Sequence, residues 1–383
     1  MDVCYNNNTK LIIKGIYKLI YLDNAATTPL CEAARQTIIE HLDTFGNPSS
    51  YHELGRESRV LIEDARERIA KCINADPSEI YFTSGGSEAN TLALNNRRHS
   101  ASSKFEHHSV VADWPKISIT NDGFINAHKL NNMLSEWWEV PFDVMSCMYV
   151  NNEIGTIQPI KELSSIAHKY GILMHTDAVQ AMPYMHIDVK DLGCDMLSAS
   201  AHKFGGPKGV GFLYANSRSR VKPIINGGNQ ENGVRPGTEN ILGILAMAAA
   251  LEDSVEHMDE CNEHIRHLRD KLLDKLLKID GAHINGSLEN RVPGNINIRF
   301  DGVSGARLVS LCSLCGVYIS SGSACSEGIS TPSHVLKAIG LSDSEALSSV
   351  RITLGHQNTE EDIRAASDII TALIKRIRED NDF

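Results

Sequence analysis

The stretch "SASAHKFGGPKGVGFLY" (residues 198–214) sets one lysine, Lys203, directly behind a histidine and ahead of a glycine-rich run. A lysine on a solvated surface needs no such neighbours. Glycines let the backbone approach a bulky group closely, or adopt angles that other residues avoid. The apolar runs before and after the lysine have the length of short strands. The stretch therefore predicts a lysine held against a ligand at a strand end.

The chain around this stretch alternates helices with short apolar strands from about residue 55 to residue 215. The helical pattern "RESRVLIEDARERIAKCI" (56–73) is followed by the strand "EIYFTS" (79–84), and "IKELSSIAHKY" (160–170) by "GILMHTDAV" (171–179). Such alternation predicts an α/β fold with a largely parallel sheet covered by helices on both faces. Ligands of these sheets bind at the carboxyl ends of the strands.

The rest of the chain predicts a second, smaller lobe, because 383 residues exceed the size at which single cores usually stop growing. A long helical pattern over 239–278 leads to an α+β region with a helical C-terminus. We expect an N-terminal arm (1–35) that packs with the small domain, a large ligand-binding domain (36–255) and a small C-terminal domain (256–383).

Composition narrows the class of protein. With 37 Lys+Arg against 48 Asp+Glu, the net charge of −11 argues against direct nucleic-acid binding. No apolar run approaches the roughly 20 residues of a membrane span, and the N-terminus lacks the pattern of a signal peptide. The nine cysteines are scattered without framework spacing, which predicts reduced thiols and a cytoplasmic protein. Cys312 and Cys315 lie in an apolar run, so we interpret them as structural and expect no metal.

Three features together indicate a cofactor. The run "YFTSGGSEANTLAL" (81–94) reads as a strand, a Gly-Gly-Ser turn and a helix start, whose free N–H groups suit a phosphate. Asp177 ends a predicted strand; alone, such a residue is more often a helix cap. With Lys203 downstream, these are the parts that pyridoxal 5′-phosphate requires: an amine for its aldehyde, a carboxylate for its ring nitrogen and a phosphate cup.

Cys325 stands in the polar stretch "SSGSACSEGIS" (320–330), with no apolar pattern to bury it. A thiol in an exposed loop is a candidate nucleophile, although an incidental loop cysteine would give the same pattern. The cofactor argument favours the nucleophile.

In its sequence motifs the chain resembles a known family, the pyridoxal-phosphate-dependent cysteine desulfurases of the longer-loop group. These belong to the class V aminotransferases of fold type I. The similarity begins at "YLDNAATTP" (21–29) and reaches "SVRITLG" (349–355). Between them, in order, stand "FGNPSS", "TSGGSEAN", "VNNEIGTIQPI", "HTDAVQ", "SASAHKFGGPKGVGF", "GVRPGTEN" and "SSGSACSEGISTPSHVLKAIG". The resemblance implies a mainly parallel seven-stranded sheet in the large domain and a smaller α+β C-terminal domain.

The resemblance also implies the site. Lys203 would bind the cofactor aldehyde as a Schiff base, His107 would stack on the ring and shuttle protons, and Cys325 would take the sulfur. Arg351, with Asn152, would bind the substrate carboxylate through its bidentate fork. Cofactor contacts are expected from Gly86, Ser87, His107, Asn152, Asp177, Gln180, Ser200, His202 and Lys203, and from Thr238 of the partner subunit in a homodimer.

The implied activity converts L-cysteine to L-alanine and leaves a persulfide on Cys325. That sulfur would pass to an acceptor protein, either an iron–sulfur scaffold or a tRNA-thiolation enzyme. Two alternatives remain: another pyridoxal enzyme of this fold, such as a selenocysteine lyase or an aminotransferase, or a slow paralogue that acts as a partner in sulfur trafficking. The sequence departs from the family pattern at "GGNQE", where Asn229 replaces a glycine, and in shortened segments on both sides of His107.

Overall fold

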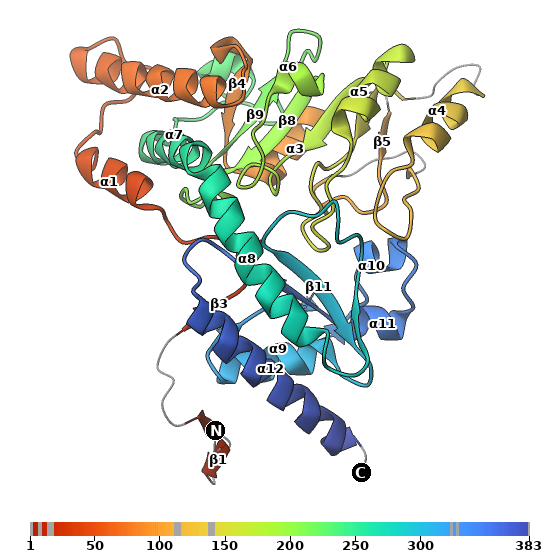
Figure 1. The fold of residues 1–383 in the computed structure, drawn as a ribbon. Coiled ribbons are helices and arrows are strands. Elements are labelled where there is room, and N and C mark those ends of the chain that lie inside the picture. The colour runs from red at the N-terminus through yellow and green to blue at the C-terminus, as the bar shows by residue number, and fades with distance from the viewer. Residues whose placement is uncertain are drawn as a thin grey trace.

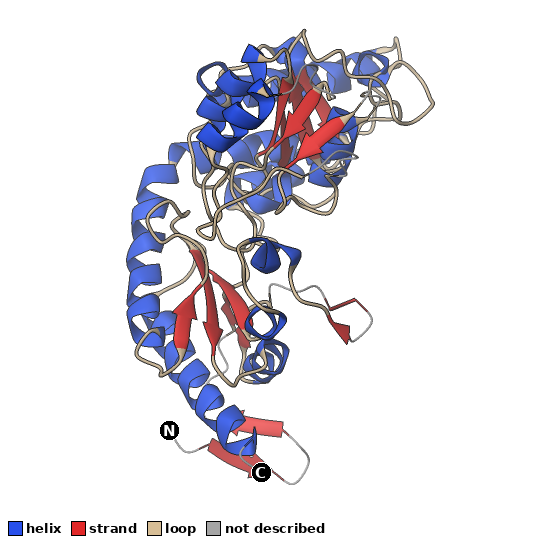
Figure 2. Cartoon of the chain, turned by 90° about the vertical axis from the view of Figure 1, so that its right-hand side faces the viewer, coloured by secondary structure: helices blue, strands red, loops and turns tan. Residues whose placement is uncertain are grey.

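The computed structural model describes residues 3–6, 10–13, 19–95, 97, 99–110, 116–136, 142–321, 325–326 and 329–381. The chain forms two lobes, each built around its own sheet (Figures 1 and 2). Helix α8 (Met258–Leu276) runs from one lobe into the other (Figure 1). The architecture is the α/β fold that the sequence predicts.

The sheet of the large lobe has the strand order β4-β9-β8-β7-β6-β5. Neighbours from β8 to β5 pair in parallel, whereas β9 is antiparallel to both β4 and β8. A parallel sheet of this kind brings the carboxyl ends of β6, β7 and β8 to one edge. The strands are β4 (Ile80–Thr83), β5 (Ser100–Ser102), β6 (Val144–Ser146), β7 (Leu173–Asp177), β8 (Met196–Ser200) and β9 (Gly211–Ala215).

The prediction of seven strands needs correction for the part of the chain that the structure describes, where this sheet has six. In the described residues between β5 and β6, the strand-like pairing consists of isolated bridges, Ser103 with Ile117 and Ile119 with Ile125, followed by helix α4 (Ala127–Ser135). Single bridges do not extend into a ladder, so the described part of this segment adds no further strand. The shortened sequence around His107 lies in this region.

Helices cover the large sheet, and the most apolar of them is the most buried. Helix α7 (Ile241–Glu256) buries every residue from Gly243 to Leu251. It packs against the two helices that precede the first strand of the sheet (Figure 1). The helices of this lobe besides α4 and α7 are α1 (Glu32–Glu40), α2 (Glu53–Cys72), α3 (Gly86–Leu94), α5 (Ile160–Lys169) and α6 (Val189–Leu192).

The small lobe has an antiparallel sheet of order β10-β11-β15, against which α8 and the C-terminal helix α12 pack a separate apolar cluster. Two short helices of this lobe, α10 and α11, pack on Phe105 and Ile154 of the large lobe. The elements are β10 (Ala282–Ile284), β11 (Asn295–Phe300), α9 (Gly305–Leu314), β12 (Val317–Tyr318), β13 (Cys325–Ser326), β14 (Ile329–Ser330), α10 (His334–Ala338), α11 (Asp343–Leu347), β15 (Ser349–Thr353) and α12 (Glu360–Asn381).

The N-terminal segment joins the small lobe before it reaches the large one. Strand β3 (Ile20–Tyr21) pairs in parallel with β12, and Leu22 is buried in the small-lobe cluster. Ahead of it, β1 (Val3–Asn6) and β2 (Lys10–Ile13) form an antiparallel hairpin. The domain limits predicted at 35/36 and 255/256 stay a prediction. Within the described ranges, no helix combines the length and apolarity needed to cross a membrane.

Candidate active site

A cavity of about 300 Å³ opens at the carboxyl edge of the large sheet, beside the N-terminus of α3. Most of its lining comes from the large lobe, and Arg351 enters from β15 of the small lobe. Residues far apart in the sequence therefore meet at one place. The predicted cofactor and substrate residues that line it are Gly86, Ser87, His107, Asn152, Asp177, Gln180, Ser200, His202, Lys203 and Arg351.

Lys203 ends the 3-10 helix η2 (Ala201–Lys203), which directly follows β8. Its Nζ donates hydrogen bonds to the backbone carbonyls of Ala25 (2.7 Å) and Ala26 (2.8 Å). Burial and the nearby charge of Arg351 lower the pKa of Lys203 to about 8, partly opposed by the carboxylate of Asp177. About a tenth of this amine is therefore unprotonated at pH 7, far more than in an ordinary lysine, and only the unprotonated form is a nucleophile or base.

Asp177 is the last residue of β7, and only 3% of it is exposed. Its Oδ2 accepts a hydrogen bond from the side-chain amide of Asn90 (2.7 Å), and its Oδ1 accepts one from the backbone N–H of Val179 (3.0 Å). Burial raises the pKa of Asp177, and these hydrogen bonds oppose the rise. Because both partners are uncharged, the carboxylate suits a cationic N–H group placed in the cavity.

Two residues that the sequence analysis missed connect Asp177 to His107. The amide nitrogen of Asn90 also donates to Oγ of Ser109 (2.9 Å), and that oxygen lies 2.7 Å from Nδ1 of His107. The backbone N–H of Ser109 donates to the same nitrogen (3.1 Å), so Nδ1 is an acceptor and the neutral ring carries its proton on Nε2. Burial lowers the pKa of His107, which favours the neutral ring.

His107 and not its neighbour lines the cavity. The ring of His108 lies 4.7 Å, centroid to centroid, from that of His334 at the start of α10. The two adjacent histidines therefore face different surroundings, His107 the cavity and His108 the ring of His334.

The turn before α3 is tightly packed and has glycine at two positions where a side chain would not fit well. Gly85 has a φ of 150°, and a Cβ at Gly86 would lie 2.7 Å from a methyl group of Val179. Helix α3 begins at Gly86, so its first backbone N–H groups have no partner within the helix. Burial and the charge of Lys203 lower the pKa of nearby His202 to about 4, so its ring is neutral. The helix N-terminus is thus a place for a phosphate.

Arg351 already holds a carboxylate, that of Asp23, another residue that the sequence analysis missed. Its Nη2 lies 2.8 Å from Oδ1 of Asp23, and its Nη1 donates to the backbone carbonyl of Asn152 (3.0 Å). Nε is buried and has no hydrogen-bond partner in the described part of the chain. A guanidinium carries five N–H groups, so Arg351 keeps donors beyond these two bonds for an incoming acceptor. Gln180 donates to Ala25 (2.8 Å), which fixes the turn after Asp23.

Two predicted residues remain to be placed, the one expected to act across a dimer interface and the one expected to take the sulfur. Thr238 is exposed and lines a separate cavity of about 150 Å³. The backbone of Cys325 lies in β13, but its side chain falls outside what the structure describes. The described chain on either side of its segment is anchored at the site. Ser320 exchanges backbone hydrogen bonds with Arg351 (3.0 and 2.6 Å), and Nε2 of His334 lies 2.9 Å from the backbone carbonyl of Glu106.

A sequence model of the class-V aminotransferases matches residues 20–365, which is most of the chain. The chain belongs to the class-V aminotransferase family. It is 42% identical to "Cysteine desulfurase IscS" of Dictyoglomus turgidum over 379 residues, covering 94% of this chain and 95% of that protein. Within the family, the chain belongs with the cysteine desulfurases.

Solved structures of this family share its fold. A NifS-like protein from Rickettsia africae is 32% identical with a TM-score of 0.87, over 94% of this chain and all of that one. A structure described as SspA in complex with cysteine is 34% identical with a TM-score of 0.75, over 88% of this chain and 99% of that one.

The cofactor of this protein, as a member of the family, is pyridoxal 5′-phosphate, and the cavity fits it. The buried carboxylate of Asp177, the lysine of lowered pKa and the open helix N-terminus at Gly86 match its ring nitrogen, aldehyde and phosphate. In the described residues no cluster of His, Cys, Asp and Glu could hold a metal ion.

Proposed function

We propose that this protein converts L-cysteine to L-alanine and moves the sulfur to Cys325. The arrangement of Lys203, Asp177 and Arg351 in one cavity carries the proposal, because it joins an amine, a ring-nitrogen partner and a carboxylate clamp. The overall change is L-cysteine plus the Cys325 thiol giving L-alanine plus the Cys325 persulfide. The test is a measurement of alanine and sulfide formed from L-cysteine with a reductant present. Absence of both products from cofactor-loaded protein would reject it.

In this proposal each side chain has a separate task. When bound, pyridoxal phosphate supplies an aldehyde for the substrate amine and a ring that accepts electrons from its Cα. Arg351 holds the substrate carboxylate, and the neutral amine of Lys203 removes the Cα proton. The neutral ring of His107 holds a proton at Nε2, within the same cavity, for transfer to or from the substrate. The thiolate of Cys325 receives the sulfur.

Asp177 and the α3 turn would hold the cofactor. We assign the ring nitrogen to Asp177 and the phosphate to Gly86 and Ser87, with support from Ser200 and His202. Gln180 and Asn152 lie at the cavity wall and would contact the ring and substrate. Two observations support these assignments. The residues line one cavity, and the buried carboxylate of Asp177 is hydrogen-bonded to the uncharged amide of Asn90.

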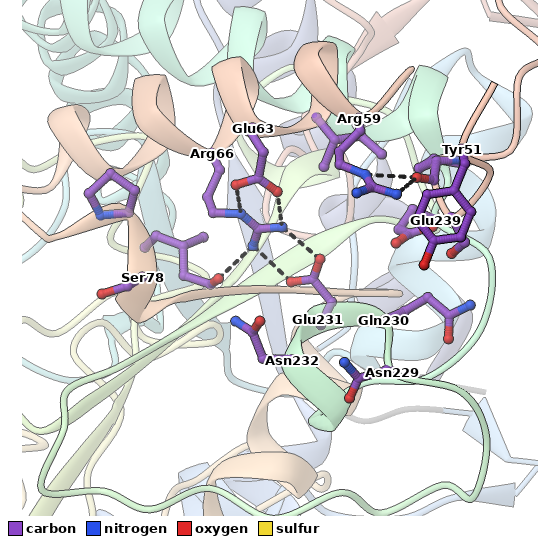
Figure 3. A pocket seen from close by; sticks show the side chains of 15 residues that line it. Tyr51, Arg59, Glu63, Arg66, Ser78, Asn229, Gln230, Glu231, Asn232 and Glu239 are labelled. Carbon is purple, nitrogen blue, oxygen red and sulfur yellow. Dashed lines mark hydrogen bonds and ion pairs between the residues drawn. The ribbon is translucent and has the colours of Figure 1, made fainter. Parts of the chain in front are cut away.

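We also infer a homodimer in which Thr238 completes the phosphate site of the partner subunit. Thr238 is exposed and faces a cavity other than that of Lys203, so it is available to a second chain. Large apolar side chains stand exposed on α1, α2 and the turn between them, among them Phe45 (79%) and Tyr51 (90%). Tyr51 also lines a further cavity of about 800 Å³ next to the Thr238 segment (Figure 3). Light scattering would test the dimer.

The persulfide on Cys325 needs a protein that accepts its outer sulfur. We propose an acceptor protein of iron–sulfur cluster assembly or of tRNA thiolation, without direct contact to nucleic acid. Transfer of labelled sulfur from L-cysteine to each purified candidate acceptor distinguishes the two.

Uptake of pyridoxal phosphate by the cofactor-free protein should depend on pH through Lys203. Its pKa is lowered to about 8, so the reactive neutral amine is scarce below that pH and dominant above it. The uptake rate should rise about tenfold per pH unit below pH 8 and level off above it. Stopped-flow absorbance from pH 6 to pH 10 measures this. A rate that keeps rising to pH 10 would show an unperturbed lysine.

Replacement of Asn90 by alanine should slow turnover while cofactor binding persists. The change removes a hydrogen bond to the buried carboxylate of Asp177 and disconnects Ser109 from it. Hydrogen bonds to charged groups are worth enough to predict a loss of about tenfold or more in alanine formation. Thr91→Ala, one residue along the same helix and exposed, is the matched control. Equal rates of alanine formation in both variants would show that Asn90 has no role in turnover.

A further inference from the structure

The cavity of about 800 Å³ lies between α2 and the 3-10 helix η3 (Gln230–Gly233), as Figure 3 shows. Glu239, the residue after Thr238, also lines it. A buried ion pair crosses it. The guanidinium of Arg66, from α2, binds both carboxylate oxygens of Glu231, at 2.7 Å and 2.8 Å. Both side chains are almost fully buried.

Two backbone groups and an aromatic ring also contact this pair. The carboxylate of Glu231 also accepts the backbone N–H of Phe82 (2.8 Å), and Arg66 donates to the backbone carbonyl of Ile80 (2.7 Å). The guanidinium lies 4.5 Å from the centroid of the Phe82 ring. Glu231 is thereby tied to strand β4, which leads directly into the α3 turn. Such a bidentate pair fixes direction as well as distance.

The backbone at this point is strained. Glu231 has φ 48° and ψ 45°, and Asn232 has φ 55° and ψ 30°, so two successive residues other than glycine adopt the left-handed region. That conformation is unfavourable for residues with a Cβ and persists only where surrounding contacts enforce it. The bonds of the Glu231 carboxylate to Arg66 and to the backbone N–H of Phe82 are contacts that hold this residue in place.

The segment that begins at η3 is also held near its other end, just before Thr238. Arg235 pairs with Glu88 in the first turn of α3, with Nε 2.8 Å from Oε1. The side-chain oxygen of Gln230 accepts the backbone N–H of Gly237 (3.2 Å). Thr238 follows immediately and is exposed. Thus Thr238 stands at the end of a short loop with both ends held by the body of its own subunit.

We propose that Glu231, held by Arg66, is a positioning residue that sets the place of Thr238 for the cofactor phosphate of the partner subunit. The inference rests on the proposed homodimer, in which Thr238 acts across the interface. Glu231 does not touch the cofactor. It fixes the strained turn in the free subunit, so that the loop needs no ordering when the second chain and its cofactor are bound.

Mixed dimers test this, because an effect across the interface must appear in the other chain. One chain carries Lys203→Ala, so only its partner can join the cofactor to a lysine. In the first arrangement Glu231→Gln is in that same Lys203→Ala chain. In the second arrangement it is in the chain that keeps Lys203. Titration with pyridoxal phosphate, followed by the visible absorbance of the lysine-bound cofactor, gives its dissociation constant in each dimer.

The dissociation constant should rise about tenfold in the first arrangement and stay unchanged in the second, relative to the dimer without the change at Glu231. Arg66→Lys, which keeps the charge but loses the two-pronged bond, should give the same pattern. It also serves if Glu231→Gln fails to yield folded dimer. Glu63→Gln is the matched control, because Glu63 pairs with the same guanidinium from a half-exposed position on α2.

A third variant distinguishes a failure of the positioning role of Glu231 from a failure of the partner role of Thr238. Thr238→Ala is placed in both arrangements as well. If Thr238→Ala weakens binding only in the first arrangement but Glu231→Gln and Arg66→Lys leave it unchanged, the positioning role is wrong. Equal weakening in both arrangements would show a general structural role, which also overturns it. If Thr238→Ala changes neither arrangement, the proposed partner role of Thr238 fails, and the inference with it.

Discussion

Replacement of Lys203 by alanine is expected to reduce alanine and sulfide formation from L-cysteine by about 10³-fold or more. Among the described residues the amine is the only lysine nitrogen that lines the cavity, and its pKa is lowered to about 8. No neighbouring described side chain offers another primary amine at that position. Initial rates of alanine formation, measured with excess pyridoxal phosphate, give the result.

A matched control exists in the same glycine-rich stretch. Lys208 is exposed and does not line the cavity, so Lys208→Ala should keep nearly the full rate. The Lys203→Ala protein should still bind pyridoxal phosphate, because Asp177 and the α3 turn remain, but borohydride should no longer fix it to the chain. Normal turnover by this variant would place the reactive amine elsewhere.

The sequence predicted the parts of the site that follow strands. Asp177 and Lys203 stand at or just beyond the ends of β7 and β8, and Gly86 opens the helix after β4. Because parallel neighbouring strands end at one edge, a local pattern of strand then polar residue was enough to bring these residues together. Their motif spacing and the family resemblance point to the same residues.

The residues that the sequence analysis missed act through contacts between distant parts of the chain. Asp23 and Arg351 are separated by 328 positions, and nothing in either local pattern reveals their ion pair. Asn90 had a weak signal, since it lies one helical turn beyond Gly86 and so faces the same side of α3. Ser109 had none. The left-handed backbone of Glu231 could not be predicted either, because such a conformation at a residue other than glycine depends on the partner that holds it.

The strand count shows a different limit. The family resemblance predicted seven strands in the large-lobe sheet. In the described residues, however, the shortened chain between β5 and β6 makes only isolated bridges. A family resemblance transfers a fold as a whole, whereas local deletions act on single elements at its edge. β5 is the edge strand of the sheet, where the loss of a neighbour disturbs no buried pairing.

Replacement of Cys325 by alanine should separate cofactor chemistry from sulfur transfer. The described anchor at Ser320 is hydrogen-bonded to the backbone of Arg351, at the cavity wall. Five residues of extended chain reach at most about 17 Å, a length sufficient to bring a thiol at position 325 to a substrate held by Arg351. We expect the variant to keep the absorbance of bound cofactor and its change on adding L-cysteine, but to lose persulfide.

Sulfide release from Cys325→Ala should fall about 10²-fold or more, because no thiolate receives the sulfur. Cys261→Ser is the control: this half-buried thiol lies on α8, burial raises its pKa, and it does not line the cavity. Persulfide is measured by mass spectrometry of peptides after a single turnover with labelled L-cysteine. Label on any cysteine other than Cys325, at the full wild-type yield, would reassign the acceptor and leave the roles of Lys203 and Asp177 intact.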